Sequence, residues 1–137
     1  MSFTTTTKVR FAHVDAAGIV FYPRYFEMLN GAVEDWFAHM GLDFGRMHLE
    51  EHIGVPTVKL DVTFLRPSGL GDLLTITVTP REIGRSSCAL TALFSGEGGE
   101  RLRAEVVLVC MDLKAQRSTP WPEALREQMT SYLAPAA

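Results

Sequence analysis

The chain has few of the features that mark redox, metal-binding, membrane or nucleic-acid-binding proteins. Its two cysteines, Cys88 and Cys110, lie in apolar strand-like runs without CxxC spacing or neighbouring histidines, so neither a redox motif nor a zinc site is predicted. A formal net charge of −3 disfavours nucleic acid as a partner. No window approaches the roughly 18 apolar residues of a membrane span, and the N-terminus lacks the apolar part of a secretory signal. We expect a cytoplasmic protein without metal or cofactor.

The remaining composition is that of an ordinary globular domain. The chain has 137 residues, of which 47% are apolar and 21% are charged, and this balance argues against a disordered or fibrous protein. The length suits one hydrophobic core and is short for two. We therefore expect a single domain over residues 1–137.

A long amphipathic helix is predicted to begin near Tyr22. Pro23 suits the first helical turn, where its missing N–H costs nothing. Apolar side chains then recur at three- and four-residue steps up to Gly41, which is typical of a helix end. These side chains are Phe26, Leu29, Val33, Trp36 or Phe37, and Met40. Shorter helices are expected within residues 43–52 and 122–133.

Strand-forming residues concentrate in five other segments, 4–11, 57–65, 73–83, 86–94 and 102–113. Short Gly-, Pro- or Asp-containing breaks separate the last four, which favours antiparallel neighbours. The order of one strand, one long helix and four strands predicts an α+β domain, with an antiparallel sheet of about five strands around the helix. Such a sheet has exposed edges, so we expect two chains to join edge to edge as a homodimer.

The segment DAAGIVFYP places the carboxylate of Asp15 a few residues before the long helix. The first N–H groups of a helix lack intrahelical partners, and with the helix dipole they can stabilise negative charge developing on a carbonyl oxygen. Gly18 permits a turn and a close approach of the backbone to a ligand. These residues suit acyl transfer, but the spacing also fits a structural turn that Asp15 caps and Gly18 completes.

The longer stretch RFAHVDAAGIVFYPRYFEML resembles the N-terminal motif of the 4-hydroxybenzoyl-CoA thioesterase family of hotdog proteins. In that motif an aromatic strand end precedes D-x-A-G-I-V-[FWY]-Y-P-x-Y. The similarity continues more weakly through the helix, the VPTV strand opening and the GDLLTI strand. The resemblance implies a hotdog fold, acyl-CoA thioesterase activity and a dimer with active sites shared across its interface. It also implies that two dimers often form a homotetramer.

By its position in the motif, Asp15 matches the family's catalytic carboxylate, acting as nucleophile through a mixed anhydride or as general base on water. Tyr22 matches the residue whose backbone N–H polarises the thioester carbonyl. Pro23 stands where the similar Tol-Pal-associated thioesterases usually carry His, which favours the 4-hydroxybenzoyl-CoA branch. Hotdog thioesterases with a Glu nucleophile on the helix match poorly, so Glu27 and Glu34 are expected to be solvated.

The resemblance also assigns candidate substrate-binding residues. Phe21 and Tyr25 lie nearest the motif and are expected to shape the acyl pocket, with Gly18 allowing close approach. Thr57 and Lys59 begin the strand that, in the family, passes near that pocket. For Lys59, simple exposure to solvent is the alternative.

Coenzyme A carries phosphates, which need cations or N–H groups at the mouth of a pocket. Arg85, Ser86 and Ser87 adjoin the turn that corresponds to the family's nucleotide-binding region, and we predict that they bind CoA. Arg66, before a Gly-rich turn, is a further candidate that would reach a phosphate from a neighbouring subunit. For Arg81 a phosphate contact and a solvated charge are both open.

His13 lies two residues before Asp15, so in an extended segment both side chains would point the same way. It would then orient or protonate Asp15, or else make only a local structural hydrogen bond.

Phe26, Trp36 and Phe37 follow the helical stripe, and we expect them to pack in the core.

The residues and the resemblance together predict hydrolysis of an acyl-CoA thioester, with a compact aromatic acyl group such as 4-hydroxybenzoyl or benzoyl. The aromatic preference rests on the resemblance alone. One alternative is a thioesterase for short or medium aliphatic chains. Another is a hotdog module that binds acyl-CoA without turnover.

Overall fold

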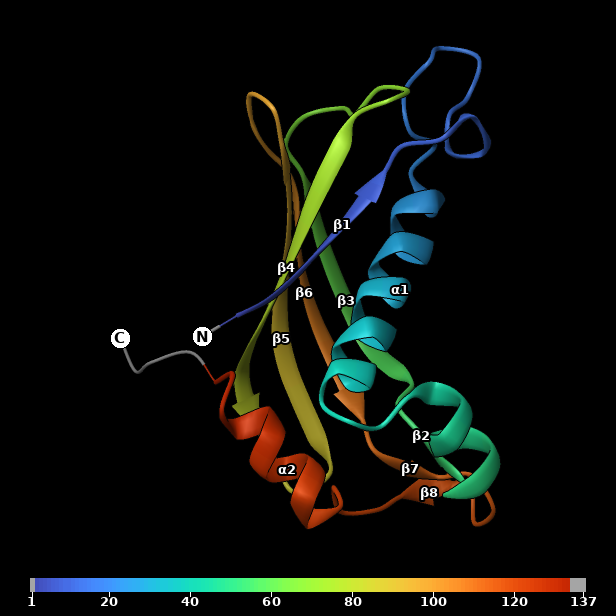
Figure 1. Cartoon of the computed structure of the whole chain (residues 1–137), viewed down its shortest axis with the longest axis vertical. Helices are drawn as coiled ribbons and strands as arrows, with labels where there is room; N and C mark the ends of the chain where they lie inside the picture. Colours follow the sequence, from blue (N-terminus) through green and yellow to red (C-terminus); the bar gives the residue numbers. More distant parts are fainter. Residues whose placement is uncertain (1, 134–137) are drawn as a thin grey trace.

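The computed structural model describes residues 2–133. Its main sheet has five antiparallel strands in the order β1-β4-β5-β6-β3. They are Phe3–Lys8 (β1), Thr57–Phe64 (β3), Leu73–Ile83 (β4), Ser87–Gly96 (β5) and Gly99–Val109 (β6). The sheet curves alongside one long helix, α1, Pro23–His39 (Figure 1). The predicted α+β architecture of five antiparallel strands and one long helix is confirmed.

The sequence sets both ends of α1. Pro23 occupies the first helical position. At the other end Gly41 has a φ of 94°, where a side chain would be strained. This conformation lets the Gly41 N–H donate to the Ala38 carbonyl and the Leu42 N–H donate to the Phe37 carbonyl, both at 3.0 Å. Those two bonds satisfy carbonyls that a helix end otherwise leaves free.

The core lies between α1 and the sheet. Trp36 and Phe37 have no exposed surface, which confirms that these rings pack inside. Phe26 is only half-buried at the margin of the core, while Tyr25 takes a buried position in the stripe. Full burial of an apolar side chain contributes about 1.5–3 kcal/mol. The helix is therefore held chiefly by packing.

Several boundaries differ from the prediction. β1 ends at Lys8, and Phe11–His13 forms a short 3₁₀ helix (η1) instead of continuing the strand. Within residues 43–52 the helical segment η2, Arg46–Glu50, has π-type hydrogen bonding. The last helix, α2, is Glu123–Thr130.

The segment 102–113, predicted as one strand, is divided at Cys110. The Cys110 N–H donates to the Ser86 carbonyl at 2.8 Å, which takes this residue out of the β6 pairing. Beyond it, Met111–Asp112 (β7) pairs with Ile53–Gly54 (β2) and Arg117–Ser118 (β8) in a second, three-stranded sheet.

The antiparallel order gathers the connections at two ends of the main sheet. One end holds residues 9–22, 65–72 and 97–98, beside the first turn of α1 (Figure 1). The turn 84–86 and α2 lie at the opposite end. None of the helices in residues 2–133 is long and apolar enough to cross a membrane.

Candidate active site

The Asp15 loop, defined here as residues 14–20, is a closed turn held by its own backbone. The Asp15 N–H donates to the Ile19 carbonyl, and the Gly18 N–H donates to the Asp15 carbonyl, both at 3.0 Å. Gly18 has a φ of 79°, which favours glycine at this position. Val14 and Val20 form an antiparallel bridge, and the Phe21 N–H donates to the His13 carbonyl at 2.9 Å. The loop therefore returns the chain to the start of α1.

The carboxylate of Asp15 is exposed, and one of its two oxygens accepts a hydrogen bond. Its Oδ1 accepts the Ala17 N–H at 2.8 Å, which makes a turn of the kind expected for Asp. Among the described residues no ion pair involves Asp15. One carboxylate oxygen is thus oriented by the backbone, and the other is available to water or a thioester.

The first turn of α1 leaves one useful donor. Pro23 has no N–H, and the N–H groups of Arg24 and Tyr25 donate to the carbonyls of Phe21 and Tyr22 at 2.9 and 3.1 Å. Among the backbone hydrogen bonds found within residues 2–133, none has the Tyr22 N–H as its donor. This N–H stands at the positive end of the helix dipole. It is the group that can polarise a carbonyl oxygen next to the Asp15 loop.

An aromatic groove of about 330 Å³ opens beside this turn. We use the name aromatic groove for the hollow lined by Ile19, Val20, Tyr22, Tyr25, Phe64, Leu65, Arg66 and Pro67. The Phe64 ring lies 6.4 Å from the Tyr22 ring and 6.0 Å from the Tyr25 ring. Tyr25 therefore lines the groove from its buried position. Sequence reasoning missed Phe64, because its place beside α1 follows from the order of the strands in the folded sheet.

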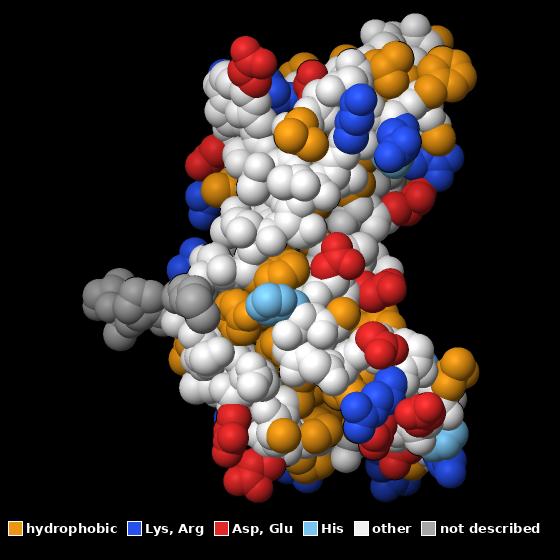
Figure 2. Space-filling view, viewed as in Figure 1, with side chains coloured by type: hydrophobic (Ala, Val, Ile, Leu, Met, Phe, Trp, Pro, Cys, Tyr) orange, Lys and Arg blue, Asp and Glu red, His pale blue; other side chains and the backbone are white. Residues whose placement is uncertain are grey.

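The other predicted substrate-binding residues are distributed differently. Phe21 is exposed with its ring 5.6 Å from that of Tyr22, outside the groove. Figure 2 shows hydrophobic side chains at this end of the molecule, where Phe11 is also exposed. Thr57 lines a second, helix–edge hollow of about 210 Å³ between α1 and β3. Lys59 is exposed beside Leu60, which lines that hollow, so alternation along the strand turns Lys59 away.

The candidate CoA-binding residues are not brought together within one chain. Arg66 lines the aromatic groove and donates to the Gly98 carbonyl. Arg85, Ser86 and Ser87 lie at the opposite end of the sheet, beside α2. There the Ser87 carbonyl accepts the indole N–H of Trp121 at 3.0 Å.

Arg81 has an observed partner within the chain. Its Nε donates to the hydroxyl of Thr91 at 3.0 Å, and that hydroxyl donates to Glu105 at 2.9 Å. Arg81 is thus an exposed residue whose Nε hydrogen-bonds within its own chain.

His13 makes a local structural hydrogen bond, which was one of the two roles considered for it. It ends the 3₁₀ helix, so the extended segment expected before Asp15 is absent. Its Nδ1 accepts the Arg10 N–H at 2.8 Å. Of the hydrogen bonds found in the described part of the chain, none joins His13 to Asp15.

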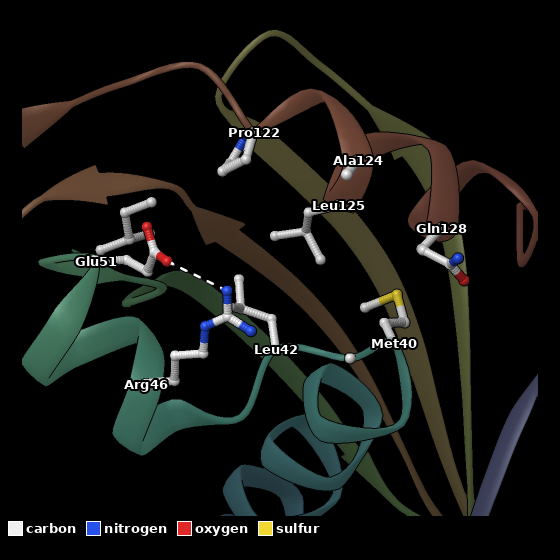
Figure 3. Close-up of a pocket in the computed structure, with 10 residues that line it drawn as sticks. Met40, Leu42, Arg46, Glu51, Pro122, Ala124, Leu125 and Gln128 are labelled. Atoms are coloured by element: carbon white, nitrogen blue, oxygen red, sulfur yellow. Dashed lines mark ion pairs between the residues drawn. The ribbon is translucent and has the colours of Figure 1, made fainter.

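Another hollow, of about 300 Å³, lies far from the Asp15 loop, where the end of α1 meets η2 and α2 (Figure 3). Met40, Leu42 and Leu125 supply apolar walls, and Arg46 at its rim pairs with Glu51 at 3.6 Å. None of the candidate site residues lines it. We assign it no chemistry.

Comparison with known proteins identifies the family. Residues 9–129 match the model of the thioesterase-like superfamily. A 1,4-dihydroxy-2-naphthoyl-CoA hydrolase of Thermosynechococcus vestitus is 31% identical, over 85% of this chain and 81% of that protein. The long-chain acyl-CoA thioesterase FadM of Escherichia coli is 30% identical, over 91% of this chain and 95% of its own length.

The fold agrees with solved thioesterases. An Asp-to-Asn variant of 4-hydroxybenzoyl-CoA thioesterase, in complex with 4-hydroxybenzoyl-CoA, superposes with a TM-score of 0.85 at 28% identity, covering 93% of this chain and 98% of that one. The hotdog fold is confirmed. The resemblance to 4-hydroxybenzoyl-CoA thioesterases holds at the level of the superfamily, where that enzyme is a structural neighbour. The chain is therefore a thioester hydrolase that belongs to the thioesterase-like superfamily.

Proposed function

We propose that this enzyme hydrolyses acyl-CoA thioesters at the junction of the Asp15 loop and α1. The observation that carries the proposal is the unpaired Tyr22 N–H at the positive end of α1, next to a loop that presents a half-free carboxylate. Oxyanion stabilisation by a preorganised N–H and a carboxylate near the carbonyl carbon are the two requirements of thioester hydrolysis. The family gives the same roles to the matching motif positions.

In the proposed reaction the thioester oxygen accepts the Tyr22 N–H, which stabilises the negative charge of the tetrahedral intermediate. Asp15 either adds to the carbonyl carbon or removes a proton from an attacking water. In the first case the CoA thiolate leaves and water then hydrolyses the mixed anhydride. In the second case the free acid and CoA form in one addition and elimination. The exposure of Asp15 leaves both routes open to water.

For the acyl group we propose a compact aromatic acid, such as benzoyl or 4-hydroxybenzoyl. The rings of Tyr22, Tyr25 and Phe64 wall the groove beside the reactive groups, and aromatic rings favour offset or edge-to-face contact with one another. The relative from Thermosynechococcus vestitus, named for a naphthoyl substrate, supports an aromatic acid.

A second candidate substrate is an aliphatic acyl-CoA. The helix–edge hollow runs between α1 and β3 and is lined by Phe26, Leu29 and Val33 on the helix side. An alkyl chain would fit such an apolar lining. FadM, named as a long-chain acyl-CoA thioesterase, is 30% identical to this chain, against 31% for the naphthoyl-CoA hydrolase.

We propose that the site is completed by a second chain. β3 is an edge strand with nearly all its residues exposed, among them Val58 and Phe64. Pairing two β3 edges would bury these groups and continue the sheet. A further pairing of dimers would let Arg85, Ser86 and Ser87 of one chain reach CoA bound at the Asp15 loop of another.

The test is hydrolysis of a panel of aromatic and aliphatic acyl-CoAs, read with a dye that reacts with the released CoA thiol. The protein's own thiols do not interfere, because burial raises the pKa of Cys88 to about 12 and that of Cys110 to about 11. The panel ranks benzoyl-CoA against hexanoyl- and palmitoyl-CoA. Binding of acyl-CoA without release of thiol from any substrate would favour the non-enzymatic alternative.

Asp15→Asn should lower kcat by at least about a hundredfold, because Asn preserves the turn but has no charge. Asp43→Asn is the matched control. Its Oδ1 also accepts a backbone N–H at 2.8 Å, from Arg46, at the other end of α1. Asp43→Asn should keep wild-type kcat, and unchanged turnover in Asp15→Asn would remove Asp15 from the mechanism.

A further inference from the structure

Arg101 is a buried cation that a β-bulge turns into the protein. In the pairing of β5 with β6, Phe94 faces Leu102 and Ser95 faces Glu100, so Arg101 is the extra residue. A bulge redirects the side chain that it contains. The Arg101 side chain is 6% exposed, whereas that of Arg103, two residues on, is 46% exposed.

The guanidinium joins two connections at the Asp15 end of the sheet. From one nitrogen it donates to the carboxylate of Asp72 at 2.8 Å and to the hydroxyl of Ser68 at 3.1 Å. From another it donates to the Glu97 carbonyl at 2.7 Å. Asp72 also accepts the Gly69 N–H at 2.9 Å on the same oxygen. Arg101 therefore fixes residues 67–72 against the β5–β6 turn.

Those residues in turn hold the Asp15 loop. The Val20 N–H donates to the Ser68 carbonyl at 2.9 Å, and Ile19 bridges Gly69. The Asp72 carbonyl accepts the Val9 N–H at 2.8 Å, just before the 3₁₀ helix. Both flanks of the catalytic segment thus rest on the loop that Arg101 organises, through Ser68 and Asp72.

We propose that Arg101 is a positioning residue for the thioesterase reaction, which holds Asp15 in register with the Tyr22 N–H through Ser68 and Asp72. The inference rests on the proposed function of Asp15. Arg101 is buried behind the loop and acts through it, so it is not a catalytic residue. Lysine, with one nitrogen, cannot span the same acceptors.

Loss of the guanidinium should lower kcat more than it changes KM. A displacement of about 1 Å in a reacting group costs up to about a hundredfold in rate. We expect Arg101→Met to lose about 10- to 100-fold in kcat with KM within about threefold of wild type. Arg101→Lys should fall between Arg101→Met and wild type. Arg103→Met, in the same strand, should match wild type.

Kinetics are measured well below each variant's melting midpoint, on the full chain with its best substrate from the panel. Hydrogen exchange of the peptide amides in residues 14–22 gives a second readout. We expect faster exchange there in Arg101→Lys and Arg101→Met, with unchanged exchange in the middle of β5. Should Arg101→Met fail to fold, Arg101→Lys carries the test.

Lower melting midpoints with wild-type kcat and wild-type exchange in residues 14–22 would make Arg101 purely structural and overturn the inference. That result is separable from failure of the proposed function. If the proposed function fails, Asp15→Asn itself retains activity. If only the Arg101 inference fails, Asp15→Asn is inactive and the Arg101 variants are active.

Discussion

Replacement of Asp72 by Asn tests how much the Arg101 contact contributes to stability. Asn keeps the shape and can still accept the Gly69 N–H, but it loses the charge opposite Arg101. Breaking a buried ion pair costs about 3–5 kcal/mol, and an exposed pair contributes about 0–1 kcal/mol. The Arg101 side chain is 6% exposed and that of Asp72 is 37% exposed, so solvent screens this pair in part. We therefore expect a loss of about 2 kcal/mol, or about 8 °C in Tm for a domain of this size.

The loss should depend on pH with a defined sign. The hydrogen bond from Arg101, and then that from the Gly69 N–H, hold the pKa of Asp72 below its ordinary value. A carboxyl whose pKa is lowered by folding adds stability above its unfolded pKa, about 3.9, and loses it as the pH falls through its folded pKa. The difference between wild type and Asp72→Asn should be constant from pH 7 to about pH 5. It should shrink below about pH 4.

Urea unfolding at several pH values, at one protein concentration so that association does not vary, gives these free energies. Asp61→Asn is the control, because Asp61 lies directly opposite Glu105 across β3 and β6 and gains nothing from its charge there. Equal stability of wild type and Asp72→Asn at pH 7 would refute the argument. So would a difference that stays constant down to pH 3.

Three further predictions concern catalysis, CoA and assembly. Tyr22→Phe should retain most of the wild-type kcat, because the proposed contact uses the backbone N–H; a loss as large as that of Asp15→Asn would contradict that role. Arg85→Ala should raise KM for acyl-CoA about tenfold, equal to one charge-assisted bond of about 1.4 kcal/mol, without affecting a short thioester that lacks the nucleotide. Equal effects on both substrates would argue against a phosphate contact. Val58→Glu on the β3 edge should give monomers in sedimentation, while Thr6→Glu on the other edge should not; a dimer in both variants would exclude β3 as the interface.

The sequence was sufficient for the parts of the fold that depend on local periodicity. The three- and four-residue spacing from Pro23 to Gly41 predicted α1, because a helix buries the stripe that its own period creates. The strands after residue 57 were also predicted from local patterns, namely runs of strand-forming residues separated by short turns. The division at Cys110 was not, since it depends on a hydrogen bond to Ser86, which lies in a separate connection.

The reactive part of the candidate site could also be found in one continuous motif. Asp15, Gly18 and Tyr22 lie within eight residues, so the turn and the helix start follow from local chemistry. The residues that line the aromatic groove could not be found in this way. Phe64 meets Tyr22 only because β3 ends at the same edge of the sheet at which α1 begins. Such a contact depends on topology.

The position of Arg101 could not be predicted from the alternation of residues along its strand. Simple alternation in β6 would put Arg101 and Arg103 on the same face, both solvated. The bulge shifts Arg101 by one residue relative to that pattern, so one arginine lies inside with four acceptors from residues 67, 68, 72 and 97, and the other lies outside with Glu100 at 4.0 Å. Burying an arginine is costly, and here the two terminal nitrogens reach acceptors, whereas the Nε has no partner among the described residues. The extra residue in β6 is therefore explained by the acceptors that it reaches, and these lie in connections that only the folded sheet brings together.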